Sequence, residues 1–235
     1  VYKRQLLLVS SVLSFIVGSI VGLSQVRIKR LLTFSTINHV GFLLLALAVS
    51  TEESVEGFVF YLVQYSLTNV NTFLTILAFG YITKGILQNN SNVREFVLLD
   101  DLKGQFYKNP LLVISFSVSL FSMAGIPPLM GFFAKQMVLY SVSYNYSYVA
   151  ILAIVMSVIS ASYYLKIVQL MFFQKDSAPT TLSSEGETSE TETPLITSMH
   201  SSVIAILTLM ISLYLFDSSI LLNACHLLSL SLFSS

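Results

Sequence analysis

The sequence is poor in charge and almost free of cysteine. Only 10% of its 235 residues are charged, against about a quarter in an ordinary soluble domain. The single Cys225 excludes an internal disulfide and any zinc or iron–sulfur site built from cysteines. Twelve Lys and Arg balance twelve Asp and Glu, so no basic field is present to attract nucleic acid. Phosphate-binding glycine loops, nucleophile elbows, HExxH motifs and paired His/carboxylate clusters are also missing, and we expect no metal site.

Long uncharged runs take the place of these features, since 54% of the residues are hydrophobic. Each run reaches or exceeds the roughly 20 residues that cross a bilayer as a helix. The runs cover residues 5–26, 31–51, 57–83, 109–134, 136–165 and 193–216. The sequence therefore predicts an all-α polytopic membrane protein with about six transmembrane helices.

The cations are distributed unevenly between the loops. If the spans alternate in direction, eight cations fall on one side of the membrane and only Lys3 and Arg4 on the other. The eight are Arg27, Lys29, Arg30, Lys84, Arg94, Lys103, Lys108 and Lys175. The positive-inside rule then places loops 24–30, 84–108 and 175–194 on the cytoplasmic or matrix side.

Lys135 and Lys166 are the two cations that have no loop. Lys166 is nine residues from Lys175 and could extend its side chain to the interface. Lys135 follows 26 uncharged residues and precedes 30 more, where an ammonium costs several kcal/mol unless it faces water, a partner or a cavity. We interpret Lys135 as a functional residue.

A helix break is predicted just before Lys135. Gly125, Pro127, Pro128 and Gly131 lie inside an apolar run, where proline removes backbone donors and bends a helix. Non-helical backbone at this depth is tolerated where it is buried in protein or lines a wet cavity. A kink that only improves packing is the alternative.

Other polar residues are predicted at similar depth. His39 lies ten residues beyond Lys29, about 15 Å into a helix, and serves either a proton path or packing. Gln64, Asn69 and Asn71 lie near the centre of 57–83, where they either hydrogen-bond a chain of waters or join helices. Ser14, Gly18 and Gly22 are spaced by four, which predicts close helix packing.

The predicted organisation has four parts. Residues 1–175 hold helices at about 5–26, 31–51, 57–83, 109–143 (broken) and 147–174. Residues 176–194, rich in Glu, Ser and Thr, form a flexible acidic loop. Residues 195–216 are the last transmembrane helix, and the apolar tail 217–235 lies along the membrane interface.

Two long motifs resemble one family. Residues 22–41, GLSQVRIKRLLTFSTINHVG, resemble the segment Q-x-x-I-K-R-L-L-A-Y-S-S-I-x-H-x-G of the antiporter-like subunits of respiratory complex I, the NADH:ubiquinone oxidoreductase. Residues 122–135, SMAGIPPLMGFFAK, resemble their broken helix S-L-A-G-I-P-P-x-x-G-F-x-x-K. The pattern over 55–79 and 160–170 is similar to the subunit 2 type, called subunit N in bacteria.

The resemblance implies a fold of fourteen helices with two inverted five-helix repeats. This sequence then carries the second repeat and the final helix, and either a separate chain supplies the first half or the sequence is part of a longer one. The resemblance also implies that Lys135 is a proton carrier in the half-channel toward the positive side. His39 and, less directly, Gln64, Asn69 and Asn71 support the water path.

The implied function is proton translocation coupled to electron transfer from NADH to quinone elsewhere in the complex. The chain itself would hold no cofactor, with FMN, iron–sulfur clusters and quinone bound by other subunits. Its partners would be lipids and other membrane-arm subunits, with no nucleic acid. High Phe, Tyr and Ser with no Trp favour a mitochondrial inner membrane, with a bacterial plasma membrane as the alternative. A subunit of a multisubunit sodium/proton antiporter and a purely structural assembly subunit are rival interpretations.

Overall fold

The computed structural model describes residues 2–86, 98–174, 198–214, 216 and 218–233. These residues form helices, with one isolated β-bridge between Arg27 and Leu98. The longer helices are α1 (Tyr2–Ile16), α2 (Ile28–Val49), α3 (Glu52–Ile86), α5 (Pro110–Ala124), α6 (Met130–Ser143), α7 (Ser147–Phe173), α8 (Ser198–Leu213) and α9 (Ser219–Phe233). The π-helical turn η1 (Val17–Val21) continues α1, and the short η2 (Leu99–Leu102) and α4 (Gln105–Lys108) precede α5.

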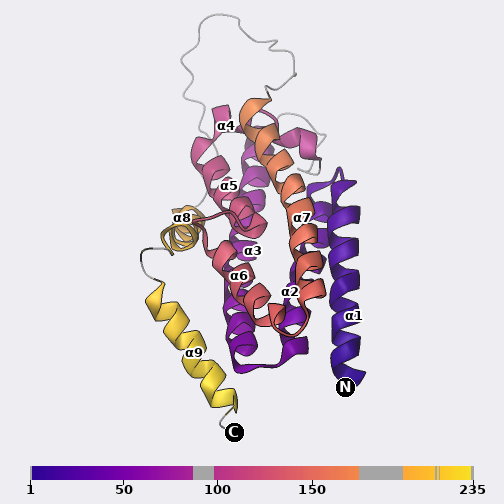
Figure 1. The fold of residues 1–235 in the computed structure, drawn as a ribbon. Helices are drawn as coiled ribbons and strands as arrows, with labels where there is room; N and C mark the ends of the chain where they lie inside the picture. Colours follow the sequence, from indigo (N-terminus) through magenta and orange to yellow (C-terminus); the bar gives the residue numbers. More distant parts are fainter. Residues whose placement is uncertain (1, 87–97, 175–197, 215, 217, 234–235) are drawn as a thin grey trace, which may run out of the picture.

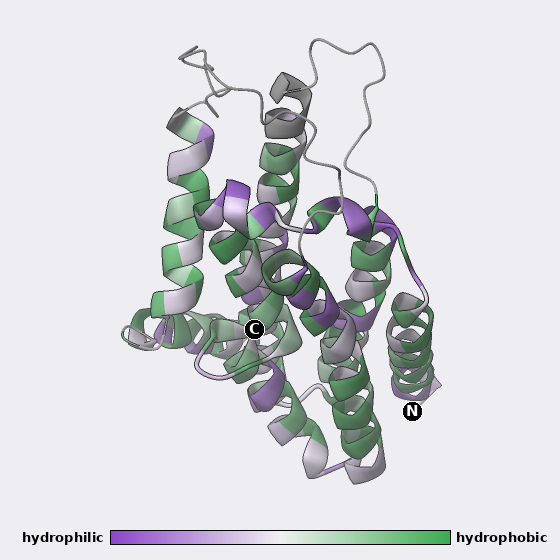
Figure 2. Ribbon diagram, turned by 90° about the horizontal axis from the view of Figure 1, so that it is seen from above, coloured by the Kyte–Doolittle hydropathy of each residue, from purple (hydrophilic) through white to green (hydrophobic). Residues whose placement is uncertain are grey.

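The long helices run alongside one another as a bundle (Figure 1). The pair α5 and α6 together follows the length of one helix, with an irregular segment between them. Helix α8 is seen nearly end-on in Figure 1 and lengthwise in Figure 2, so it crosses the direction of the bundle. Helix α9 runs obliquely and packs on α3.

The packing of α1 and η1 on α2 depends on a small residue. A Cβ atom at Gly18 would lie 2.7 Å from the backbone nitrogen of Asn38 and 2.8 Å from the backbone oxygen of Phe34. The chains therefore approach backbone to backbone at this point. This confirms the predicted close packing at Gly18.

A tight turn reverses the chain between α2 and α3. Ser50 adopts a left-handed conformation with φ of 53°, which ends α2. Thr51 then caps α3: the Ser54 backbone N–H donates to Thr51 Oγ1 over 3.3 Å, and the Thr51 N–H donates to Ser54 Oγ over 3.0 Å. Glu52 and Glu53 in the first turn complement the positive end of the helix. The turn sets the register in which α2 and α3 face each other.

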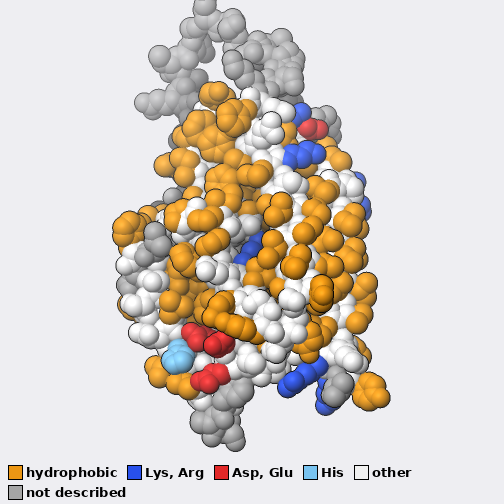
Figure 3. Space-filling model, in the orientation of Figure 1, with side chains coloured by type: hydrophobic (Ala, Val, Ile, Leu, Met, Phe, Trp, Pro, Cys, Tyr) orange, Lys and Arg blue, Asp and Glu red, His pale blue; other side chains and the backbone are white. Residues whose placement is uncertain are grey.

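The surface fits a membrane environment. Within the described residues, three helices are long and apolar enough to span a bilayer, namely Tyr2–Val21, Ile28–Val49 and Ser147–Phe173. In Figure 3, most charged side chains gather toward the two ends of the molecule, one Lys or Arg side chain is visible midway between them, and hydrophobic side chains cover most of the remaining face. The predicted all-α membrane fold is confirmed in class, whereas the number of spans stays a prediction.

The predicted boundaries can be compared with the helices. The spans predicted at 5–26, 31–51, 57–83, 109–143 and 147–174 overlap α1 with η1, α2, α3, α5 with α6, and α7. The predicted last span at 195–216 contains α8, which has 16 residues and lies across the bundle. The tail at 217–235 contains the helix α9. The acidic loop at 176–194 and Arg94 lie outside the described residues.

Candidate proton-transfer site

The predicted helix break lies between Ala124 and Met130. Gly125 takes the left-handed conformation with φ of 84° and ends α5 in a Schellman motif. Its N–H donates to the Ser122 carbonyl over 3.1 Å, and the Ile126 N–H donates to the Phe121 carbonyl over 3.1 Å. Pro127 and Pro128 follow, and α6 begins two residues later. The helix therefore breaks where the glycine and proline pattern predicts it.

A second glycine lets the two halves of the break touch. A Cβ at Gly131 would lie 1.8 Å from the Ser122 carbonyl oxygen, so only glycine fits there. The Gly131 N–H donates to Ser122 Oγ over 3.2 Å. Gln64 Nε2 on α3 donates to the same oxygen, also over 3.2 Å. Gln64 is therefore a support of the break.

Lys135 reaches back across the break to the end of α5. Its Nζ donates to the carbonyl oxygens of Met123 and Ala124, each over 2.9 Å. The side chain is 7% exposed and makes no salt bridge to a described residue. These carbonyls belong to the last turn of α5, whose helix dipole places negative partial charge there. A backbone end thus occupies the place of a counter-ion.

An open groove leads to this lysine. It has a volume of about 700 Å³ and lies between the break and α7. Gly125, Pro127 and Lys135 line it on one side, and Ile154 and Ser157 on the other. The methylene chain of Lys135 lies against Gly125, where a Cβ would come within 3.0 Å of Cδ. A side chain at position 125 would displace the lysine.

His39 lies in a separate cluster formed by α2, α3 and α7. It is 1% exposed, and both ring nitrogens are occupied. Nδ1 is 2.7 Å from the Tyr61 hydroxyl oxygen, and Nε2 is 3.2 Å from that of Tyr164. The Tyr164 hydroxyl also hydrogen-bonds Ser35 Oγ. The Tyr65 ring stacks on the imidazole, with centroids 4.8 Å apart.

One aromatic ring links the two sites. The Phe42 centroid lies 5.7 Å from Lys135 Nζ, and the Phe42 ring stacks on Tyr61 at 5.6 Å. Among the described residues no hydrogen bond joins Lys135 to His39. The two titratable groups are therefore neighbours that an apolar side chain separates.

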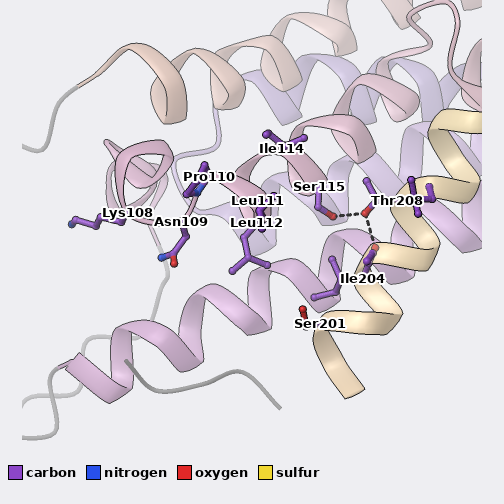
Figure 4. Close-up of a pocket in the computed structure, with 12 residues that line it drawn as sticks. Lys108, Asn109, Pro110, Leu111, Leu112, Ile114, Ser115, Ser201, Ile204 and Thr208 are labelled. Carbon is purple, nitrogen blue, oxygen red and sulfur yellow. Dashed lines mark hydrogen bonds between the residues drawn. The ribbon is translucent and has the colours of Figure 1, made fainter. Parts of the chain in front are cut away.

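Asn69 and Asn71 are not brought to either group. Asn71 is fully buried, and its Nδ2 donates to Ser119 Oγ over 2.8 Å. It also donates over longer distances to Ser115 and Thr208, whose hydroxyls are 2.6 Å apart at the edge of a groove between α5 and α8 (Figure 4). Asn69 is half-buried, and its side chain has no hydrogen bond within the described residues. The polar residues of α3 therefore bond to different parts of the structure, with Gln64 at the break and Asn71 at α5 and α8.

Comparison with known proteins places this architecture in a family. Residues 2–160 match the family described as NADH:quinone oxidoreductase/Mrp antiporter, TM. The chain belongs to this family. NADH-ubiquinone oxidoreductase chain 2 of Rhizopus oryzae is 49% identical over 97% of this chain and 46% of its own length. The resemblance predicted from the two motifs is thereby confirmed.

Two solved structures share the fold. A chain of respiratory complex I from Thermus thermophilus with bound aureothin is 28% identical, with a TM-score of 0.68 over 92% of this chain and 44% of that one. A chain of the Mrp complex from Dietzia sp. DQ12-45-1b is 18% identical, with a TM-score of 0.73 over 96% and 46%, which is a likeness of fold alone. This chain spans less than half the length of these relatives.

The sequence did not reveal the partners of His39. Tyr61 and Tyr164 lie in apolar runs, and Ser35 is one of many serines. A tyrosine near the centre of a predicted span could have been singled out by the argument applied to His39, since its hydroxyl needs a partner when buried. Ser122 was also missed, because its role depends on the contact between the two halves of the break.

Proposed function

We propose that this chain is a membrane-arm subunit of a proton-translocating NADH:quinone oxidoreductase, in which Lys135 carries protons. The observation that carries the proposal is the bonding of Lys135 Nζ to two carbonyl oxygens at the end of α5. The kinship with NADH-ubiquinone oxidoreductase chain 2 of Rhizopus oryzae supports the assignment to such a complex.

The two carbonyls suit a lysine that changes protonation state. An ammonium has three N–H donors and a neutral amine has two, so both forms can satisfy both oxygens. Protonation adds one N–H, and loss of the proton leaves a lone pair, at a side chain that lines the groove. The carbonyl dipoles favour the ammonium, whereas removal from water favours the amine. A modest change in the surroundings can therefore load or release the proton.

The remaining predicted residues have supporting roles in this proposal. Gly125, Pro127, Pro128 and Gly131 form the break that exposes the carbonyls. Gln64 holds the break through Ser122. His39 belongs to the path by which protons approach Lys135. A water path along Asn69 and Asn71 stays a prediction.

The setting follows from the same kinship. We propose a multi-pass protein of the mitochondrial inner membrane, surrounded by lipids and other membrane-arm subunits of complex I. The expectation that this chain binds neither a cofactor nor a metal stays a prediction, with FMN, iron–sulfur clusters and quinone in other subunits.

A subunit of a sodium/proton antiporter is the second candidate. The similarity of fold to the Mrp complex chain favours it. The much higher sequence identity to NADH-ubiquinone oxidoreductase chain 2 favours the first candidate. Copurification of the chain with flavin and iron–sulfur subunits would decide for the oxidoreductase.

The test replaces Lys135 in the native complex and measures proton pumping into vesicles during NADH oxidation. Lys135→Ala should lower coupled pumping by about tenfold or more, because the carrier is lost. Lys135→Arg should fail as well, since a guanidinium holds its proton throughout. The matched control is Lys166→Ala, the same change at an exposed lysine of α7, which should pump normally.

Two outcomes would contradict the proposal. If assembled Lys135→Ala complex pumped at the normal rate, Lys135 would have a structural role only. If Lys135→Arg alone retained full pumping, a fixed positive charge would suffice and proton release from Lys135 would be wrong. The amount of complex on native gels separates a pumping defect from an assembly defect.

A further inference from the structure

The cluster around His39 contains an unbroken hydrogen-bonded chain. Tyr61, His39, Tyr164 and Ser35 follow one another through the contacts of both imidazole nitrogens and the Tyr164 hydroxyl. The four side chains come from α3, α2, α7 and again α2. They are between 0% and 2% exposed, so they exchange no protons with bulk water directly.

We propose that these four side chains form a proton relay that loads Lys135, with Tyr61 and Tyr164 as its proton-carrying residues beside His39. This inference rests on the proposed function and deepens it. A neutral imidazole donates from one nitrogen and accepts at the other, and each hydroxyl can do both. A continuous chain of such groups can pass a proton without any side chain leaving its place.

The direction of the relay follows from the positions of its ends. Ser35 lies seven residues beyond Ile28, the first residue of α2, which itself belongs to the basic segment 24–30. Tyr61, at the other end, stacks on Phe42, which in turn lies beside Lys135 Nζ. The relay therefore leads from the basic side of the membrane toward Lys135. Water is needed at both ends, to supply Ser35 and to pass the Phe42 ring.

One passage consists of five proton transfers, the first from water and the last to water, and leaves each side chain with the number of protons that it had. At the start, Ser35 donates to Tyr164, Tyr164 donates to Nε2, and the Nδ1–H of His39 donates to Tyr61. Water gives a proton to the Ser35 oxygen, and the Ser35 proton moves to Tyr164. The Tyr164 proton moves to Nε2, the Nδ1 proton moves to Tyr61, and the Tyr61 proton leaves to water beside Lys135. Each group keeps its number of protons, and one proton has crossed the chain.

The passage leaves the relay pointing the other way. His39 now carries its proton on Nε2, and both tyrosine hydroxyls donate toward the Ser35 end. A second proton cannot follow in the same direction until His39 returns to the Nδ1–H tautomer and the hydroxyls rotate. The relay therefore delivers one proton for each resetting of His39, which suits a pump that must not leak.

The experiment removes one hydroxyl at a time in the native complex. Tyr164→Phe and Tyr61→Phe keep the rings but interrupt the chain, and each should lower coupled proton pumping by about tenfold or more. The matched control is Tyr65→Phe, four residues after Tyr61. The Tyr65 hydroxyl donates to Thr36 over 3.0 Å and touches neither His39 nitrogen, so this variant should pump normally.

A second readout separates proton transfer from structure. Pumping by the parent complex should slow in heavy water, because protons are transferred along the relay. Tyr65→Phe should show the same slowing. The residual pumping of Tyr164→Phe should slow less, because it no longer passes through the relay. If the phenylalanine variants fail to assemble, Ser35→Ala interrupts the end of the chain with a smaller change and should show the same defect.

The outcomes distinguish the relay from the proposed function. Normal pumping by both Tyr164→Phe and Tyr61→Phe, together with lost pumping in Lys135→Ala, would overturn the relay and leave the function standing. Normal pumping by Lys135→Ala as well would overturn both. Equal loss in Tyr164→Phe, Tyr61→Phe and Tyr65→Phe would also overturn the relay, because the loss would then reflect packing.

Discussion

The break at Lys135 and the cluster at His39 bury their titratable groups by different means. Lys135 is held by two backbone carbonyls, which exist because Gly125 ends α5. His39 is held by two side-chain hydroxyls from other helices. The path of the backbone therefore provides the hydrogen-bond partners of Lys135, whereas the identity of individual side chains provides those of His39.

This difference predicts how each site responds to change. The backbone carbonyls of residues 123 and 124 are available whatever side chains these positions carry, provided that the helix still breaks after them. The imidazole of His39 loses a partner whenever one tyrosine changes. We therefore expect the break to be sensitive at its glycines and the cluster to be sensitive at its hydroxyls.

Gly131→Ala should have the largest effect on stability, and it acts at the backbone break. The new Cβ would meet the Ser122 carbonyl oxygen at 1.8 Å, which forces the two helix halves apart. We expect the free energy of unfolding to fall by about 3 kcal/mol. This corresponds to a decrease of about 6–12 °C in the midpoint temperature at which assembled complex is lost on native gels. Gly80→Ala is the control, since a Cβ there meets nothing within 4 Å. Equal midpoints for the two variants would show that the halves do not touch at Gly131.

The sequence was informative about the break for the same physical reason. Glycine and proline act locally, so Gly125, Pro127 and Gly131 mark the interruption without knowledge of any neighbour. A lysine in an uncharged run is equally visible. The helices themselves were predictable because a bilayer needs long apolar runs.

The cluster was hidden because its contacts are distant along the chain. Tyr61 and Tyr164 are 22 and 125 residues from His39, and only the packing of α3 and α7 on α2 brings them together. The stripe Gln64, Asn69 and Asn71 was seen as one group, whereas the structure directs Gln64 to the break and Asn71 to α5 and α8. The position of a residue along a helix predicts its depth in the membrane, whereas the helix that faces it determines its hydrogen-bond partner.

His39→Leu should have an intermediate effect on stability, and it tests whether side-chain hydrogen bonds hold the His39 cluster. The change leaves the Tyr61 hydroxyl and one Tyr164 contact without their partner, at a cost of about 2 kcal/mol, or about 4–8 °C in the same midpoint temperature. Asn38→Ala is the control, because the backbone and Cβ of Asn38 lie against Gly18 and a bulkier side chain would disturb that contact. It changes the preceding residue, which is also fully buried but whose amide atoms have no partner among the described residues. A larger loss in Asn38→Ala than in His39→Leu would refute the view that hydroxyl bonds hold this cluster.

Ser122→Ala should have the smallest effect, and it tests whether the break depends on any side chain at all. Ser122 Oγ accepts from the Gly131 N–H and from Gln64, so its loss should cost about 1 kcal/mol, or about 2–4 °C. Ser117→Ala is the control, because Ser117 lies on the same helix, is also buried and donates only to the carbonyl of Val113 in its own helix. If the break is a backbone device, Ser122→Ala should lower the midpoint temperature slightly and leave proton pumping intact, since the carbonyls that hold Lys135 remain in place. A loss of pumping as large as that of Lys135→Ala would mean that a side chain also decides the first site.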